Sequence, residues 1–177
     1  MRAAHDLDPL SMIIREGLGI VHMFCQDYPR AVSIHREVID MDPGFYKGYS
    51  SLGRVLSLMG KYDLAIASLE RARELGGDVP NILAALGEVQ ARAGRVKEAH
   101  GLLRELTELS QKRWVPASSF AILHLGLGDY PAALTYLEAA TDRREMPVTA
   151  LKVHPLYDPL RSEPRFQALI ERIGLNS

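Results

Sequence analysis

The chain has 177 residues, of which 47% are hydrophobic and 24% are charged, as in an ordinary globular protein. Its formal net charge of −1 gives no general attraction to nucleic acid or to an anionic membrane surface, so neither is predicted as a partner. The single cysteine, Cys25, excludes an internal disulfide framework. Together with the lack of a signal peptide or of a long apolar stretch, it predicts a cytoplasmic protein.

An interval of 34 residues recurs along the chain from about Met12 onward. Small residues keep this interval in two columns, which are Gly19, Gly53, Gly87 with Ala121, and Ala31, Ala65, Ala99 with Ala133. Large apolar residues keep it at Leu18, Leu52, Leu86 and Phe120. Apolar residues also recur at helical spacing on both sides of a short break such as GKYD. Each unit is therefore predicted to be a helix, a turn and a second helix.

In chain order, the interval divides the sequence into six segments. Residues 1–11 are expected to close a preceding repeat or to form an N-terminal extension, because Pro9 matches Pro43 one period later. Residues 12–45, 46–79, 80–113 and 114–147 are the four predicted hairpins. The chain is accordingly expected to be the C-terminal part of a longer array or of a multidomain protein.

The breaks inside the units have the chemistry of helix ends. Glycine supplies the positive φ that ends a first helix in three units, at Gly60, Gly94 and Gly128. Asp27 and Asp129 are expected to cap the second helices of their units. Pro29 and Pro131 are expected to start these helices, since a proline in the first turn loses no hydrogen bond.

The two small columns predict where the paired helices meet. Gly53 on a first helix and Ala65 on the second are the expected points of closest backbone approach, and a larger side chain at either place would force the helices apart. The remaining apolar columns are expected to face the neighbouring hairpin, so that no repeat buries its core alone.

Residues 148–177 depart from the repeat and are expected to cap the stack. Pro147 and Pro155 prevent an ordinary fifth hairpin and leave room for one short helix around residues 148–152. Ser162 is expected to cap a final helix that ends at Gly174. The apolar stripe of this helix consists of Phe166, Leu169, Ile170 and Ile173.

These columns resemble the tetratricopeptide repeat family, with its L-G pair, turn glycine and alanine, over residues 12 to about 145. The resemblance implies an all-α fold, a right-handed α-α superhelix (TPR solenoid) of four helical hairpins plus a C-terminal capping helix. The place of the family's first-helix tryptophan holds Arg15, Tyr49, Leu83 and Ala117 instead. The tail is similar to the C-terminal repeat regions of bacterial multidomain signalling and regulatory proteins, which implies a larger protein or complex.

No catalytic site and no cofactor are predicted. The serines lack the G-x-S-x-G context that follows a strand in hydrolases. The GLG triplets at 17–19 and 126–128 lie inside helical columns, with no strand before them to form a phosphate-binding loop. The sequence therefore indicates a protein that is not an enzyme.

One group of residues raises the question of a metal site. His22 and Cys25 are one turn apart on a predicted helix, and His35 is on the partner helix, so a three-ligand zinc site is conceivable. The alternative is a hydrogen-bonded core pair of His22 and His35, with Cys25 packed in an apolar column. Because no fourth ligand is in sight, we favour the alternative and predict no metal.

The predicted binding surface is the concave groove that the first helices of a right-handed stack line. Its candidate residues are Glu16, Ile20, Met23, Lys47, Ser50, Arg54, Asn81, Glu88, Ser118 and Ile122. This surface fits an extended or helical peptide, so the expected partner is a protein or peptide. The alternative function is self-association, in which an exposed end of the stack or the tail docks onto a second copy as a homo-oligomer.

One specialised version of groove binding is not expected. Chaperone-binding members of the family grip a C-terminal carboxylate with Lys, Asn and Arg side chains at five places. Here those places hold Glu16, Ile20, Ser51, Asn81 and Ala85, which offer no cation. Lys47 and Arg54 could still attract a single acidic side chain.

Overall fold

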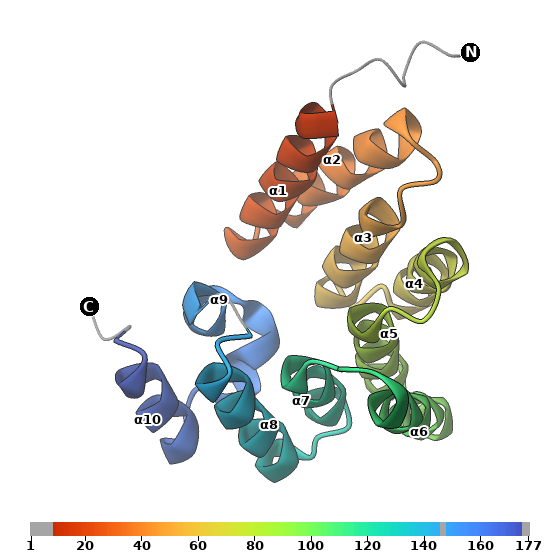
Figure 1. Cartoon of the computed structure of the whole chain (residues 1–177). Helices are drawn as coiled ribbons and strands as arrows, with labels where there is room; N and C mark the ends of the chain where they lie inside the picture. The colour runs from red at the N-terminus through yellow and green to blue at the C-terminus, as the bar shows by residue number, and fades with distance from the viewer. Residues whose placement is uncertain (1–8, 146–147, 175–177) are drawn as a thin grey trace. The chain divides into compact units, whose positions relative to one another are not determined.

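The computed structural model describes residues 9–145 and 148–174, and no β-strand occurs among them. The chain divides into two compact units, Met1–Ile82 and Leu83–Ser177, which are taken in turn. Within each unit, Figure 1 shows consecutive helices joined by short turns. The prediction of an all-α fold built from consecutive helical hairpins is confirmed.

The first unit contains two hairpins. Helix α1 (Pro9–Phe24) packs against α2 (Tyr28–Met41), and α3 (Tyr46–Leu58) packs against α4 (Tyr62–Gly76). The hairpins are joined by contacts of α3 with both α2 and α1. No hairpin therefore buries its core alone.

The second unit holds two further hairpins and the tail. Its hairpins are α5 (Pro80–Arg92) with α6 (Val96–Lys112), and α7 (Ala117–Gly126) with α8 (Tyr130–Asp142). Helix α5 begins three residues before the boundary between the units. Helix α7 packs against α8 and also contacts α6.

Prolines decide where two of the first helices begin. Helix α1 starts at Pro9, earlier than the predicted Met12, because a proline is well suited to the first turn. Helix α7 starts at Ala117, later than the predicted Trp114. Pro116, with φ −59° and ψ 137°, restricts the residue before it to an extended backbone, so the helix begins after this proline.

The turn chemistry agrees with the sequence prediction. Gly60, Gly94 and Gly128 have φ values of 73°, 80° and 75°, a region that L side chains rarely adopt. The Asp27 carboxylate accepts a hydrogen bond from the Arg30 N–H at 3.4 Å, and Asp129 accepts one from the Ala132 N–H at 3.2 Å. Pro29 and Pro131 lie in the first turn of α2 and of α8, as expected.

The helices of a hairpin meet at the predicted small residues. A Cβ placed on Gly53 would lie 2.7 Å from Leu69 Cγ and 3.0 Å from the Ala65 carbonyl oxygen. A Cβ on Gly19 would lie 2.5 Å from the His35 ring. One on Gly87 would lie 3.5 Å from Leu102 Cβ of the partner helix α6, and 2.7 Å from Leu123 on α7 of the next hairpin. The alanines of the second column, Ala31, Ala65, Ala99 and Ala133, are fully buried. Side-chain size at these columns therefore sets how closely the helices pack.

The tail forms α9 (Val148–Val153), the 3-10 helix η1 (Pro155–Leu160) and α10 (Pro164–Arg172). Helix α9 matches the predicted short helix, whereas Pro147 lies outside the described residues. The prediction that Ser162 caps the last helix is wrong. The N-cap residue is Glu163, without a side-chain cap, because Pro164 in the first turn already fixes the start of the helix.

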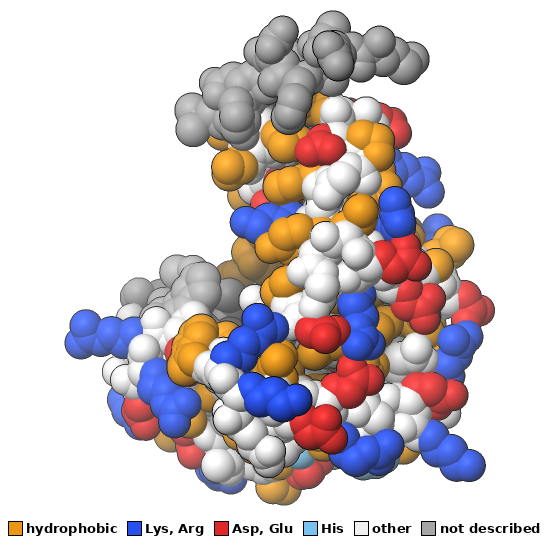
Figure 2. Space-filling view, turned by 45° about the vertical axis from the view of Figure 1, so that its right-hand side comes forward, with side chains coloured by type: hydrophobic (Ala, Val, Ile, Leu, Met, Phe, Trp, Pro, Cys, Tyr) orange, Lys and Arg blue, Asp and Glu red, His pale blue; other side chains and the backbone are white. Residues whose placement is uncertain are grey.

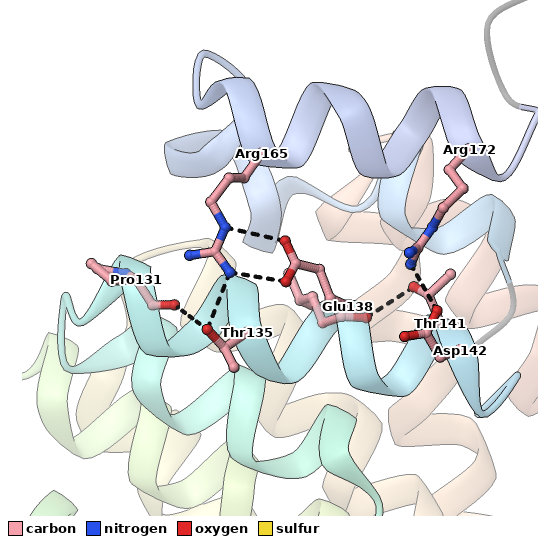
Figure 3. A network of polar contacts seen from close by, with 8 residues as sticks. Pro131, Thr135, Glu138, Thr141, Asp142, Arg165 and Arg172 are labelled. Carbon is pink, nitrogen blue, oxygen red and sulfur yellow. Dashed lines mark hydrogen bonds and ion pairs between the residues drawn. The ribbon is translucent and has the colours of Figure 1, made fainter.

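Helix α10 closes the second unit by packing against α8. Phe166 and Leu169 are each 2% exposed and belong to a cluster that includes Leu134 and Leu137, and the rest of the predicted stripe packs against it. Figure 3 shows the polar rim of this contact, where Arg165 donates to both carboxylate oxygens of Glu138 at 3.1 and 2.9 Å. The hydrogen bond to Glu138 raises the pKa of Arg165 above its ordinary value.

Replacing Gly53 with leucine is expected to destabilise the protein by about 1–3 kcal/mol, the usual cost of overpacking. The added side chain would overlap Leu69 and the Ala65 carbonyl. Gly101→Ala is the control, because Gly101 is also inside a helix but an added Cβ would meet only the guanidinium end of Arg104, at 3.9 Å. The control should gain about 0.5–1 kcal/mol in urea unfolding. Equal stabilities of the two variants would contradict the packing described above.

The stability of the packing between α10 and α8 is expected to depend more on the burial of apolar side chains than on ion pairs. Phe166→Ala should lower the free energy of unfolding by about 3–5 kcal/mol, as for other buried aromatic residues. Arg165→Ala should have a much smaller effect, because ion pairs at an exposed rim contribute little. Chemical denaturation of both variants measures the difference, and a larger loss for Arg165→Ala would reverse this order.

Candidate functional site

The predicted groove residues of the first unit lie on α1 and α3. On α1, Glu16 and Ile20 are partly exposed, whereas Met23 is only 4% exposed and packs with Ala31 and Val55. Met23 therefore belongs to the core and offers no surface to a ligand.

On α3, the predicted residues form one outward row. Lys47 is exposed, and Ser50 and Arg54 are partly exposed. Their spacing places them on one face of the helix. Leu52, which lies between Ser50 and Arg54 in sequence, is buried, and so is Val55, which follows Arg54.

A hydrogen bond joins the two helices at the edge of this row. The Ser51 hydroxyl donates to Glu16 Oε1 at 2.7 Å, and the contact is partly buried. Both residues occupy places that carry the carboxylate clamp in chaperone-binding repeat proteins. Here the first of these positions holds the anionic Glu16, and the second holds Ser51, which donates a hydrogen bond to it. An incoming carboxylate would therefore meet negative charge.

In the second unit, Glu88 of α5 is only 5% exposed. It forms an ion pair with Arg92 on the same helix, with Nη1 and Oε1 3.1 Å apart. The cause of its burial is Gly126 of α7, because a Cβ on Gly126 would lie 2.5 Å from Glu88 Cα. Glu88 therefore sits at a crossing of two backbones and is not accessible as a groove residue.

The other predicted residues of α5 and α7 are more accessible. Asn81 is exposed at the start of α5, and Ser118 and Ile122 on α7 are partly exposed. The Ser118 backbone N–H donates to Glu145 Oε2 at 3.3 Å. Because α7 has no side-chain cap of its own, Glu145 supplies a carboxylate to its first turn from the loop after α8.

Sequence reasoning missed the roles of Gly126 and Glu145. Gly126 occupies a column that holds Phe24, Leu58 and Arg92 in the other repeats, so a glycine among large residues was an available signal. Glu145 follows two arginines in a polar segment that reads as surface, and nothing local indicates that its side chain turns back to α7.

His35 is fully buried in the first hairpin, with its ring against Gly19. Neither ring nitrogen has a hydrogen-bond partner among the described residues. Burial lowers the pKa of His35 from 6.5 to about 4, because an imidazolium would lose its hydration without gaining a partner. His35 is therefore neutral at pH 7.

The predicted core pair of His22 and His35 is wrong, because His22 turns to the adjacent helix end. His22 Nδ1 lies 3.4 Å from Asp27 Oδ2, and in the fourth repeat His124 Nδ1 lies 3.2 Å from Asp129 Oδ2. Both histidines thus contact the carboxylate that caps the following helix. Cys25 is exposed, contrary to the expected packing in an apolar column, since the helix ends at Phe24.

The other concave and polar features of the described residues do not coincide with the predicted groove. One surface pocket of about 370 Å³ is lined by Lys152, Arg161, Phe166, Gln167, Ile170 and Glu171, and none of these is a predicted groove residue. Over the described ranges, no three His, Cys, Asp or Glu side chains are grouped so that they could hold a metal ion. Among the helices that the structure describes, none has the length and apolar character to cross a membrane.

Comparison with known protein families adds an independent result. Two family models, both described as tetratricopeptide repeat, match residues 56–117 and 119–152. No curated protein matches the chain.

Replacing His35 with leucine is expected to stabilise the protein by about 1–3 kcal/mol, because it removes two buried ring nitrogens that have no hydrogen-bond partner in the described part of the chain. Leucine occupies this column in the other repeats, at Leu69, Leu103 and Leu137. The parent should lose stability as the pH falls from 6.5 toward 4, since there the unfolded chain binds a proton that the folded chain does not.

Denaturation at a series of pH values measures both effects. The His35→Leu variant should lose less stability between pH 6.5 and 4 than the parent does. The control is His100→Ala, an exposed histidine on α6, which should keep the parent's pH dependence. Parallel pH curves for the parent and His35→Leu would contradict the burial of an unpaired imidazole.

Proposed function

The chain belongs to the tetratricopeptide repeat family, and we propose that it is a non-catalytic scaffold that binds a protein or peptide through the exposed rows of its first helices. Repeats of this family generally mediate protein–protein interaction and are typically not catalytic. We also propose that the chain works in the cytoplasm as part of a larger regulatory protein or complex. The exposed free thiol of Cys25 supports a reducing compartment.

The observation that carries the proposal is the outward row on α1 and α3. Ile20, Lys47, Ser50 and Arg54 are accessible, whereas Leu52 and Val55 of α3 are buried in the core of the first unit. The bond from Ser51 to Glu16 links the two helices that carry this row. A surface carried by joined helices costs a ligand less reordering than a mobile loop would.

The chemistry of this row selects the kind of peptide. Lys47 is exposed and favours an acidic side chain, and Ile20 offers an aliphatic contact on the neighbouring helix. Asn81, Ser118 and Ile122 give a second set of accessible positions on α5 and α7. Since Glu16 is anionic and already accepts a hydrogen bond, a free C-terminal carboxylate is a poor ligand.

Self-association is the second candidate function. The observation that favours it is an exposed apolar stripe on α1, which no described element covers and which contains none of the residues of the peptide-binding row.

Peptides selected by display on the immobilised protein test the first function. Peptides that bind with micromolar dissociation constants, equivalent to about −8 kcal/mol, should lose about tenfold or more in affinity for Lys47→Glu. Arg36→Glu is the matched control, since Arg36 is exposed in the same unit but on the second helix α2. The affinity of the Arg36→Glu variant for the same peptides should equal that of the parent.

The melting temperature of each variant checks that the fold is intact. Selected peptides that bind the parent and Lys47→Glu equally well would contradict binding at this row.

A further inference from the structure

One face of α1 is covered with exposed aliphatic side chains. Ile13, Ile14, Leu18 and Val21 are 57%, 61%, 47% and 53% exposed. Ile14, Leu18 and Val21 follow the spacing of a single helical face. In Figure 2, hydrophobic side chains lie in the upper part of the picture, below the grey residues. The other large exposed hydrophobic residues of the described chain, Leu64, Val96, Trp114 and Val153, are on four different segments.

The same columns are buried in the other repeats. The counterparts of Leu18, which are Leu52, Leu86 and Phe120, are 8%, 4% and 9% exposed. The counterparts of Val21 are Val55, Val89 and Leu123, and each is 0% exposed. In the first unit, the face of α3 that corresponds to this stripe is covered by α2, because a Cβ on Gly48 would lie 3.1 Å from Ile39 and 3.3 Å from Val38. The stripe on α1 therefore has the composition of a helix–helix interface.

Gly17 lies in the middle of this stripe. A Cβ on Gly17 would have no atom within 4 Å, so no packing inside the described chain requires a glycine here. A glycine inside a helix costs about 0.5–1 kcal/mol relative to alanine. Between Ile14, Leu18 and Val21 it makes a notch at which the backbone of another helix can approach closely.

Charge does not oppose apolar contact at this face. The only acidic or basic residues of α1 besides His22 are Arg15 and Glu16. Arg15 pairs with Glu37 at 3.2 Å, and Glu16 accepts the Ser51 hydrogen bond at 2.7 Å. Two identical stripes can therefore meet without bringing unpaired like charges together.

We propose that this stripe docks onto the same stripe of a second copy, with two α1 helices crossing antiparallel at Gly17 about a two-fold axis. The proposal rests on the second candidate function and is independent of peptide binding. A head-to-tail contact is disfavoured because the other end of the repeat series is closed, with α10 packed on α8. A two-fold contact uses the same surface on both copies and closes as a dimer.

Sedimentation equilibrium over a range of protein concentrations tests the proposal. The parent chain is expected to be a dimer, and the double variant Leu18→Glu with Val21→Glu should dimerise at least about a hundredfold more weakly, since four charges would enter an apolar interface. The matched control is Leu64→Glu with Val96→Glu, which places two charges at equally exposed aliphatic positions outside α1. This control should dimerise like the parent.

The variant Gly17→Glu distinguishes loss of the dimer interface from loss of folding. A Cβ at this position meets no neighbouring atom within 4 Å, and glutamate favours the helix over glycine, so helicity and the urea midpoint of the monomer should not fall. The same variant should lose dimerisation.

Each contrary result overturns the proposal in a recognisable way. A monomeric parent would overturn self-association itself, and peptide binding at Lys47 would still be open to its own test. A dimer that survives both Gly17→Glu and the double variant would leave self-association standing and remove α1 as its surface.

Discussion

The close approach of paired helices at small residues is the contact on which the rest of the structure depends. Leu69 packs directly on Gly53, and the His35 ring packs directly on Gly19. A methyl group at either glycine would overlap these side chains. This contact fixes which columns point inward, and by the geometry of a helix it also fixes which columns point outward. The accessible row of Lys47, Ser50 and Arg54 is thus a consequence of the same packing that buries Leu52 and Val55.

Periodic features were predictable from the sequence, because each is a local rule repeated at a fixed interval. The positive φ of Gly60, the capping by Asp27 and the contact at Gly53 all follow from residue type and spacing. Features that depend on a single contact between distant residues were not predictable. The burial of Glu88 is set by Gly126, far along the chain, and the cap on α7 comes from Glu145. Helix η1 was missed because its prolines indicated only a break.

The two ends of the repeat series differ in whether their apolar face is covered by other side chains. At α8, Phe166 and Leu169 cover the core, and Arg165 closes the rim through Glu138. At α1, the corresponding stripe remains exposed among the described residues. The difference comes from residues outside the repeat pattern, so it reflects the tail rather than the repeat itself. An uncovered apolar face next to a polar row gives one unit two surfaces of opposite chemistry.

The fully buried His35 has a consequence for how the first unit comes apart. Repeat proteins gain most of their stability from contacts between neighbouring helices, so a helix with one uncovered side is held by fewer of them. Among the described residues, helix α1 has such a side, and it also packs on the His35 imidazole, which has no hydrogen-bond partner there. Fluctuations that open the first unit should therefore start by fraying at α1, and mild acid should make that opening more frequent.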